Sequence, residues 1–374
     1  MKIMVATSAH PAEDPRIRYK EVSTLVDAGY NVELLHFRGV SNDQLGNLTI
    51  TGFTEHRNRF TRFFRVFWVV VKEVFRKRPD VLHIHDPDLL PLLPLARMLG
   101  IRTIYDSHEY FPCQIYTKQW IPKYLRKPLS VFFGEGELLL AKCATYLIVA
   151  TPKIQQRFHK LGRSYLVRNF PRLDLFDIAF ISETRGDMAY VGGVSKARGL
   201  IEMIEVARRS KVKLHIAGRV DAACFEVIQQ AQVDGLIKYH GVLSGNEVVK
   251  LLSRCRIGLC LLQPEPNYLD ALPTKLFEYF AMKMPAVVSD FPLWKNILKD
   301  SGAGFALNPT DIDGVVECVN RLIADTELAD KMGEQGRKYV EENCSWENER
   351  LSLLTLYNAI EKQIDFPSIP PSLT

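Results

Sequence analysis

The stretch Asp270-Ala-Leu-Pro-Thr-Lys275-Leu-Phe-Glu278-Tyr-Phe-Ala-Met-Lys-Met-Pro-Ala-Val-Val-Ser-Asp290 joins a helix to a buried strand. Pro273 and Thr274 open the predicted helix, whose first backbone N–H groups lack intrahelical partners and can bind an anion. Lys275 adds positive charge in the first turn. The apolar strand at 285–289 follows at once, which is typical of an α/β domain.

Lys275 and Glu278 are three residues apart, so they share one face of this helix. A carboxylate at 278 can accept both hydroxyls of a ribose while Lys275 and the helix end hold a diphosphate. The same pattern also fits an ordinary amphipathic helix with a proline start and an i,i+3 ion pair. The choice between these interpretations depends on the motifs in the rest of the chain.

Length and composition are those of a globular protein with room for two α/β domains in its 374 residues. The seven cysteines are scattered and form no CxxC pair, so we expect reduced thiols in a cytosolic protein. The first residues are interrupted too soon for a signal peptide, and no apolar run is long enough to span a bilayer.

The net charge of +5 is distributed unevenly along the chain. Residues 1–170 contain 25 Lys and Arg against 15 Asp and Glu, which gives +10, whereas residues 171–374 contain 23 against 28, which gives −5. This asymmetry predicts two domains with different partners, and the basic half suits an anionic surface or substrate.

Strand and helix patterns alternate, which predicts parallel sheets with buried strands. Helices are expected over 17–28, 60–77 and 345–363. The pattern weakens near 169–174 and restarts at 187. We therefore predict two doubly wound, Rossmann-like domains, 1–170 and 171–345, and a final segment 346–374 with a helix that crosses back and a loose tail. The expected strands are 2–7, 32–37, 81–85, 103–106, 146–150, 187–191, 213–217, 238–241, 257–262, 286–289 and 304–306.

The common nucleotide-binding fingerprints are absent from the sequence. There is no Walker A motif, and the segment 8–14 after the first strand has no glycine, which argues against a GxGxxG dinucleotide site. The second domain instead opens with a strand followed by Gly192 and Gly193, where the backbone can approach a ligand closely. Arg198 precedes the next helix, where its guanidinium can clamp a phosphate.

These motifs together resemble the GT-B-fold, retaining glycosyltransferases of family 4, over nearly the whole chain. The resemblance implies two Rossmann-like domains facing a cleft, with donor binding in the second. It is carried by Asp14-Pro-Arg-Ile-Arg18, Ala28-Gly-Tyr-Asn-Val-Glu33, Asp80-Val-Leu-His-Ile-His-Asp-Pro-Asp88, Tyr105-Asp-Ser-His-Glu109, the turn 192–199, His240-Gly-Val-Leu243 and the element 275–290.

The resemblance implies roles for the residues around the donor. Arg198 stands where the family has its phosphate-binding lysine, with Lys275 beside it, and Glu278 matches the ribose-binding glutamate. Asp270 replaces the first glutamate of the family's Glu-x7-Glu pattern, and its side chain is shorter. Gly193 replaces an arginine that many members carry, so one phosphate contact is either missing or supplied by Arg219.

The nucleobase is expected to meet the backbone of Val242 and Leu243. Ser244 and Glu247 directly follow and form a capping-box pattern that fixes this turn.

His108 is the catalytic candidate, because it follows a strand and by resemblance touches the donor sugar near its reacting carbon. A histidine that caps a helix beside Glu109 is the alternative. Arg16, Asp106 and Glu109 are candidates on the acceptor side. In a retaining mechanism of this type the leaving diphosphate takes the acceptor proton, and the protein supplies positioning and positive charge.

The Asp86-Pro-Asp88 triplet has the form of a metal-binding DxD motif, but two carboxylates alone make a poor cage. His83 and His85 share one strand face and are either ligands or histidines of the core or cleft. GT-B enzymes generally need no metal, so we expect no metal ion and no cofactor beyond a UDP- or GDP-sugar used as substrate.

The helix around 57–78 is basic and rich in aromatic residues, and a second basic and aromatic segment covers 118–127. The helix around 57–78 is either a sheet-covering helix with a solvated face or a membrane-docking helix. Nucleic acid is not expected as a partner, because no binding motif accompanies the charge. The helix around 57–78 carries Arg57, Arg59, Arg62, Arg65, Lys72, Arg76, Lys77 and Arg78 around Phe60, Phe63, Phe64, Phe67 and Trp68.

The sequence therefore predicts a bacterial, cytoplasmic hexosyltransferase of polysaccharide biosynthesis, docked at the inner face of the cytoplasmic membrane if the basic helix binds lipid. It would move a hexose or N-acetylhexosamine from a nucleotide sugar to a lipid-linked or cell-surface glycan acceptor. A nucleotide-sugar epimerase of the same fold and a non-catalytic sugar-nucleotide-binding protein are the alternatives.

Overall fold

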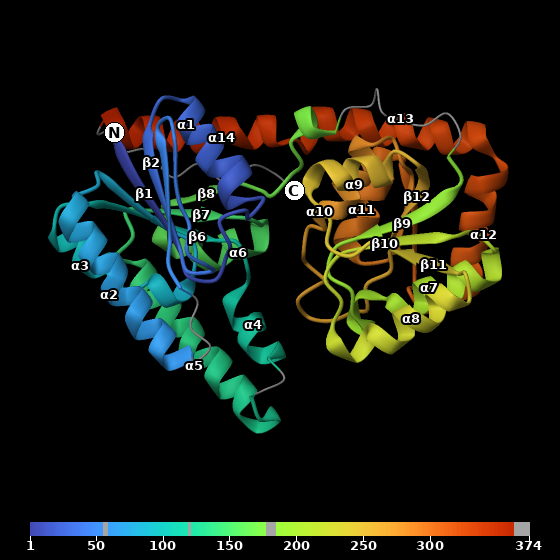
Figure 1. Cartoon of the computed structure of the whole chain (residues 1–374), viewed down its shortest axis with the longest axis horizontal. Helices are drawn as coiled ribbons and strands as arrows, with labels where there is room; N and C mark the ends of the chain where they lie inside the picture. The colour runs from blue at the N-terminus through green and yellow to red at the C-terminus, as the bar shows by residue number, and fades with distance from the viewer. Residues whose placement is uncertain (55–58, 119–120, 177–184, 363–374) are drawn as a thin grey trace. The chain divides into compact units, whose positions relative to one another are not determined.

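The computed structural model describes residues 1–54, 59–118, 121–176 and 185–362 (Figure 1). The chain forms two compact units, the first of Met1–Asn169 with Asn348–Thr374 and the second of Phe170–Glu347. The structure divides the two units between residues 169 and 170, whereas the sequence predicts the boundary between residues 170 and 171. The predicted tail from 365 onward, Arg57 and Trp120 lie outside the described residues.

The first unit is built on one sheet of order β3-β4-β2-β1-β5-β6-β7-β8, parallel except for the antiparallel pair β3–β4. The strand order reverses between β1 and β5, the position where doubly wound sheets open a crevice at their carboxyl ends. The strands are β1 (Lys2–Thr7), β2 (Asn31–His36), β3 (Asn42–Leu45), β4 (Leu48–Gly52), β5 (Val81–Ile84), β6 (Arg102–Ser107), β7 (Tyr146–Val149) and β8 (Ser164–Leu166).

Helices cover both faces of this sheet. One face, with Met4, Leu82 and Tyr105, packs on α2, α3 and α6. The other carries His83, whose Nδ1 lies 2.8 Å from the hydroxyl of Tyr357 on α14, so the C-terminal helix returns to the first unit as predicted. The helices are α1 (Ser23–Asp27), α2 (Arg59–Lys77), α3 (Leu92–Met98), α4 (Phe111–Thr117), α5 (Lys123–Ala141), α6 (Pro152–Phe158) and α14 (Trp346–Lys362), with the short turns η1 (Ile17–Val22), η2 (Pro87–Leu89) and η3 (His159–Leu161).

The predicted helix over 17–28 is wrong in its first half, where η1 is a π-helix. The backbone N–H of Glu21 donates to the carbonyl of Arg16, five residues back, at 3.0 Å. The wider turn places Lys20 and Glu21 toward the protein, where both side chains are buried. Tertiary contacts of these charged residues therefore override the regular α-helical spacing.

The second unit has a fully parallel sheet of order β11-β10-β9-β12-β13-β14. Numbered from its own first strand, this order is 3-2-1-4-5-6, the order of dinucleotide-binding folds, with the reversal between β9 and β12. The strands are β9 (Asp187–Val191), β10 (Leu214–Ala217), β11 (Ile237–Tyr239), β12 (Cys255–Cys260), β13 (Ala286–Ser289) and β14 (Gly304–Leu307).

Two hydrophobic clusters, one on each face, hold the helices to this sheet. Tyr190, Met188 and Ile216 pack on α7, α8 and α12. Ala189, Cys260 and the α10 side chains Phe277 and Phe280 form the other cluster with α9, α11 and α13. The helices are α7 (Leu200–Ser210), α8 (Phe225–Val233), α9 (Gly245–Leu252), α10 (Thr274–Ala281), α11 (Pro292–Ser301), α12 (Ile312–Ala324) and α13 (Thr326–Asn343), with the short turns η4 (Leu173–Leu175), η6 (Lys196–Arg198) and η7 (Ala222–Cys224).

Candidate functional site

The turn Gly192–Gly193 lies at the carboxyl end of β9, next to the reversal of strand order in the second unit. Gly192 has φ +129°, which favours glycine, and its N–H donates to the carbonyl of Ala217 at 2.8 Å. A Cβ at 192 would lie 3.1 Å from the Lys275 ammonium nitrogen. Glycine therefore lets the lysine approach the turn.

Lys275 brings a buried positive charge to this turn. The residue is 9% exposed, and its ammonium nitrogen lies 4.0 Å from the centre of the Tyr190 ring. Among the described residues that ammonium has no hydrogen-bond partner. A buried ammonium without a hydrogen-bonded counter-charge is unfavourable, so the site favours an anion.

Arg198 approaches the same turn from η6. Its guanidinium carbon lies 5.6 Å from the centre of the Tyr268 ring and 3.5 Å from where a Cβ on Gly193 would stand. Two cations from different elements thus converge on one glycine turn. This arrangement can hold the two phosphates of a nucleoside diphosphate.

The N-terminus of α10 adds backbone donors to these cations. Pro273 is the residue before the helix and Thr274 its first residue, with no side chain capping the first N–H groups in the described structure. Trp294 on α11 donates from Nε1 to the carbonyl of Ala271 at 2.8 Å and fixes the loop leading into α10. Glu278 is half-buried on α10. The same helix therefore carries Lys275 and Glu278, the two side chains predicted to bind the donor.

Asp270 is exposed in the loop that precedes α10. Its side chain is therefore accessible to solvent.

Val242 and Leu243 follow β11, two strands from β9, with Val242 75% exposed. The N–H of Gly218, after β10, donates to the carbonyl of Gly241 at 2.7 Å, which joins this loop to the turns beside it. The backbone N–H of Ser244 donates to Glu247 at 2.8 Å, so the predicted capping box is present. The predicted nucleobase-contacting residues thus lie on the same sheet edge as the glycine turn.

The exposed residue Arg219 follows β10 on this edge. Its carbonyl accepts from the N–H of Val194 at 2.8 Å, which places the Arg219 backbone beside the segment that follows Gly193.

In the first unit, His108 directly follows β6, with its side chain 15% exposed. Its Nε2 lies 3.1 Å from Nε2 of His10, and Nδ1 of His10 lies 2.8 Å from Asp14. The two facing Nε2 atoms need one proton between them, so the protonation of His10 fixes the tautomer of His108.

The pKa values of these two histidines shift in opposite directions. Burial lowers the pKa of His108, although Asp106 opposes the shift. Burial alone would also lower the pKa of His10, but the hydrogen bond to Asp14 and the charge of Asp86 outweigh it and raise the pKa. When Nε2 of His10 carries the proton, it donates to Nε2 of His108.

Arg16 and Asp106, which the sequence places on the acceptor side, are buried, at 5% and 0% exposure. The guanidinium of Arg16 donates to both carboxylate oxygens of Asp106, at 2.9 and 3.1 Å, and to the carbonyl of Val167. Burial would raise the pKa of Asp106, but Arg16 outweighs it and holds the pKa below its usual range. The pair supports the sheet edge, whereas Glu109 is exposed.

The two carboxylates of the Asp86-Pro-Asp88 triplet are engaged by the loop after β1. Asp86 accepts from the Thr7 hydroxyl at 2.7 Å and from the backbone N–H of Ser8 at 2.8 Å. Asp88 accepts from the Ser8 hydroxyl at 2.7 Å. These aspartates hold the segment that carries His10.

His83 and His85 lie side by side on β5 and at its end, with ring centres 4.4 Å apart. They share a buried cluster with Asp106 and Glu21. Burial lowers the pKa of His83 to about 4 and holds that of His85 well below its usual value. Burial and the neighbouring Asp106 raise the pKa of Glu21.

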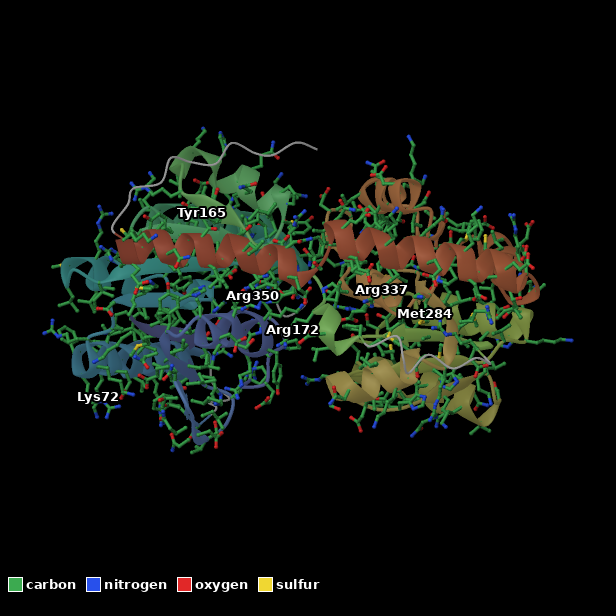
Figure 2. The ribbon with its side chains drawn as sticks, turned by 90° about the horizontal axis from the view of Figure 1, so that it is seen from above. Lys72, Tyr165, Arg172, Met284, Arg337 and Arg350 are labelled. Carbon is green, nitrogen blue, oxygen red and sulfur yellow. The ribbon has the colours of Figure 1, made fainter. Side chains whose placement is uncertain are left out.

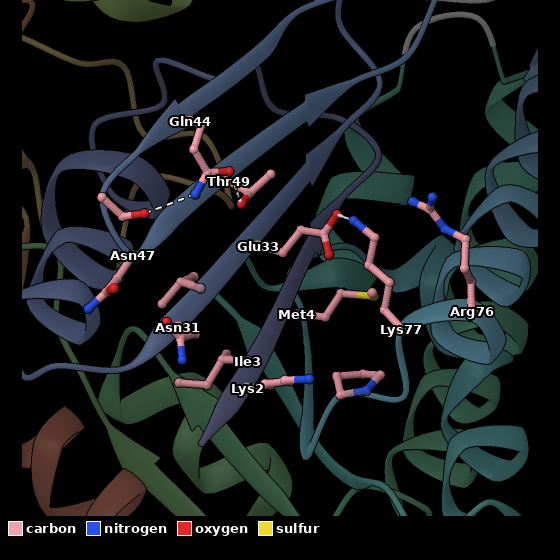
Figure 3. A pocket seen from close by; sticks show the side chains of 13 residues that line it. Lys2, Ile3, Met4, Asn31, Glu33, Gln44, Asn47, Thr49, Arg76 and Lys77 are labelled. Carbon is pink, nitrogen blue, oxygen red and sulfur yellow. Dashed lines mark hydrogen bonds and ion pairs between the residues drawn. The ribbon is translucent and has the colours of Figure 1, made fainter.

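A polar pocket lies at the amino ends of the first unit's strands, opposite the carboxyl ends that precede His85 and His108 (Figure 3). It is lined by the starts of β1, β2 and β4 and contains the ion pair between Glu33 and Lys77. Ligands of doubly wound sheets bind at the carboxyl ends, so this pocket is not the candidate site.

Helix α2 combines a buried apolar side with an exposed aromatic and basic side. Val70 is fully buried, while Phe64 and Trp68 are 60% and 64% exposed. Arg65 and Lys72 are exposed on the same helix, and Figure 2 shows Lys72 at its outer edge. Across the described residues no helix has the length and apolar character needed to traverse a bilayer.

Sequence reasoning missed His10 as the neighbour of His108 and Asp14 as the partner of His10. The signal available was their position in the loop after the first strand, at the carboxyl end of the sheet.

Family profiles match both units: group 1 glycosyl transferases match residues 172–339, and Glycosyltransferase Family 4 matches residues 19–169. The chain is similar to an O-antigen chain mannosyltransferase C of Escherichia coli, at 25% identity over 290 residues, 75% of this chain and 76% of the relative.

Solved structures share the fold. Sucrose-phosphate synthase of Thermosynechococcus elongatus has a TM-score of 0.75 at 15% identity, over 97% of this chain and 99% of the other. Anabaena HepE in complex with UDP has a TM-score of 0.69 at 12% identity, over 96% and 100%. WaaG, a glycosyltransferase involved in lipopolysaccharide biosynthesis, has a TM-score of 0.68 at 14% identity, over 94% and 98%.

Proposed function

Because the chain belongs to the GT-B-fold glycosyltransferases of family 4, we propose that it is a retaining transferase of a hexose or N-acetylhexosamine. The donor is a UDP- or GDP-sugar, and the acceptor is a lipid-linked or cell-surface glycan. The mannosyltransferase relative supports a hexose donor, and the UDP complex of a structural neighbour supports a nucleoside diphosphate leaving group.

One observation carries the proposal: Lys275 and Arg198 converge on the glycine turn at the end of β9. The two cations approach the turn from different elements, Lys275 from α10 and Arg198 from η6. The Lys275 ammonium lacks a hydrogen-bonded partner among the described residues. Together with the free N–H groups at the start of α10, they form a site for a diphosphate. Glu278 on the same helix would accept the ribose hydroxyls.

The chemistry follows from where charge develops. As the bond between the sugar and the diphosphate breaks, negative charge grows on the leaving phosphate, and Lys275 and Arg198 stabilise it. The leaving phosphate oxygen then takes the proton from the acceptor hydroxyl, so no protein nucleophile is needed. These two cations do the work that a metal ion does in other transferases, and we propose that transfer is metal-independent.

His108 would contact the donor sugar near its reacting carbon. Its Nε2 faces His10, and Asp14 in turn fixes His10. His10 is therefore a positioning residue, which holds the imidazole of His108 in one tautomer and orientation.

The exposed side of α2 supports a location at the inner face of the cytoplasmic membrane. Aromatic side chains beside arginine and lysine suit the headgroup layer of an anionic bilayer. Phe64, Trp68 and Phe75 supply the aromatic surface, and each is at least 44% exposed.

A thermal-shift screen of UDP- and GDP-sugars identifies the donor, since a ligand at 100 times its Kd stabilises the protein by about 2.7 kcal/mol. Donor turnover is then measured with and without a lipid-linked acceptor. A transferase releases nucleoside diphosphate only with the acceptor. An epimerase turns the donor over without an acceptor, and a binding protein does not turn it over at all. Either of these two results would contradict the proposal.

A further inference from the structure

Four side chains of metal-ligating type meet inside the first unit, on the sheet face below η1 and α14. They are Glu21 from η1, His83 from β5, His85 directly after it, and Asp106 from β6. One nitrogen or oxygen atom from each lies within 4.8 Å of the others. Every one of these side chains is at most 1% exposed, so the cluster belongs to the interior.

Three of the atoms that face one another are unsatisfied. Within the described residues, no hydrogen-bond partner contacts Oε2 of Glu21, Nε2 of His83 or Nε2 of His85. Buried polar atoms are normally paired, and three unpaired atoms at one point are unusual. The convergence therefore indicates a bound group that all of them contact.

The distances select the kind of group. Oε2 of Glu21 lies 3.6 Å from Nε2 of His85 and 4.0 Å from Nε2 of His83, which lies 3.9 Å from Oδ2 of Asp106. A direct hydrogen bond needs about 2.7–3.2 Å, and a bridging water separates its partners by about 4.5 Å. Ligands bound tetrahedrally to Zn²⁺ at about 2.0–2.1 Å lie about 3.4 Å apart. The observed gaps are longer than a direct hydrogen bond and shorter than a water bridge, and the shortest of them, 3.6 Å, is the one closest to the Zn²⁺ ligand spacing.

Contacts behind three of the four side chains match those that orient metal ligands. Nδ1 of His83 lies 2.8 Å from the hydroxyl of Tyr357, which leaves the Nε2 lone pair directed at the cluster when Nδ1 donates. Arg16 donates to Asp106 and lies 2.9 Å from the second oxygen of Glu21, Oε1. One guanidinium offsets the charge of one carboxylate, and a bound cation would offset the charge of the other.

We propose that Glu21, His83, His85 and Asp106 bind a divalent transition-metal ion, with Zn²⁺ the best fit to two imidazoles and two carboxylates. Four protein ligands make a closed site, which is structural and takes no part in transfer. The ion would join η1 to β5 and β6 and brace the sheet edge that carries His108. Because the cluster is sealed, it is loaded as the chain folds.

The metal content of the full-length protein tests this site. The protein is produced with Zn²⁺ in the medium, dialysed in the native state against chelator, then acid-denatured and analysed by mass spectrometry for metals. The expected result is about one ion per chain, retained through dialysis and lost in His85→Asn. His215→Asn is the matched control, since His215 already bonds His240 and Asp187. A metal-free wild type, or equal metal in His85→Asn, overturns the proposal.

Refolding of the wild type provides a second measurement that needs no variant. The protein is unfolded in guanidinium with chelator and refolded with the chelator alone or with added ZnCl₂ or MgCl₂. The expected result is a Tm several degrees lower without metal, restored by Zn²⁺ and not by Mg²⁺. An identical Tm in all three samples overturns the proposal.

Discussion

Replacing Lys275 by methionine should separate donor binding from stability. Methionine keeps most of the length of the lysine side chain and removes its charge. The Lys275 ammonium is buried, contacts the Tyr190 ring and has no hydrogen-bonded partner in the described part of the chain. Its charge is therefore available to a phosphate.

The size of the effect follows from the geometry. A phosphate charge about 4 Å from the ammonium interacts by about 4 kcal/mol at an effective dielectric constant of about 20. Part of this is offset by desolvation, so we expect a loss of about 2–4 kcal/mol, or about 30- to 700-fold in donor Kd.

The thermal stability of Lys275→Met should rise or stay unchanged, although its donor affinity falls. The variant loses a cation–π contact of about 2 kcal/mol but no longer buries an ammonium, which itself costs several kcal/mol. The Tm of Lys275→Met should therefore equal or exceed that of the wild type.

Calorimetric titration with UDP, GDP and their sugars measures the affinity, and scanning calorimetry measures the Tm. Lys295→Met on α11 is the control, because Lys295 is half exposed and pairs with Asp290. Wild-type donor affinity in Lys275→Met, or a lowered Tm with unchanged affinity, would show that the lysine is a packing residue and refute the reasoning.

Further predictions concern metal, membrane and pH. Excess chelator in the assay should leave transfer intact, because Lys275 and a helix end meet the phosphate charge; loss of activity restored by Mg²⁺ would contradict this. The double variant Arg65→Gln and Lys72→Gln should sediment less with anionic vesicles, since each basic residue near the surface contributes about 1 kcal/mol; equal binding would identify α2 as an ordinary sheet-covering helix. The raised pKa of His10 stabilises the fold below its unfolded value of about 6.5, and this contribution is lost as the pH rises through the folded pKa. His10→Asn should thus lower the Tm more at about pH 5 than at about pH 9, with the exposed His159→Asn as control; a pH-independent difference would refute the shift.

Much of the fold follows from apolar strand patterns. Residues 2–7, 187–191 and 286–289 are strands with the predicted limits, because each is a buried run bounded by turn-forming residues. The helix start at Pro273 and Thr274 was also predictable, since proline fits the entry to a helix and breaks its interior.

The edge strands could not be predicted in the same way. Every residue of β3, Asn42–Leu45, is exposed, and its polar sequence has no alternation to indicate a strand. The sequence of β4, Leu48–Gly52, does alternate between buried and half-buried side chains, and this signal was missed. Pairing with a neighbour, which the local sequence does not encode, makes β3 a strand.

The donor side was easier to predict from sequence than the histidine side. Gly193, Arg198 and Lys275 lie in sequence motifs that predict a phosphate site, and the structure places them around one turn. His10 and Glu21 acquire their neighbours only through the fold, across 98 residues to His108 in one case and through a π-helix in the other. Long-range contacts of this kind leave no local pattern.

The most direct test of the account is to follow both products of one reaction. The wild-type protein is incubated with the nucleotide sugar selected by thermal shift and a lipid-linked glycan, and nuclear magnetic resonance follows the anomeric carbon. The account predicts released nucleoside diphosphate in equal amount to an acceptor that gains one sugar, with the anomeric configuration of the donor. Release without acceptor, or a product of inverted configuration, would contradict it.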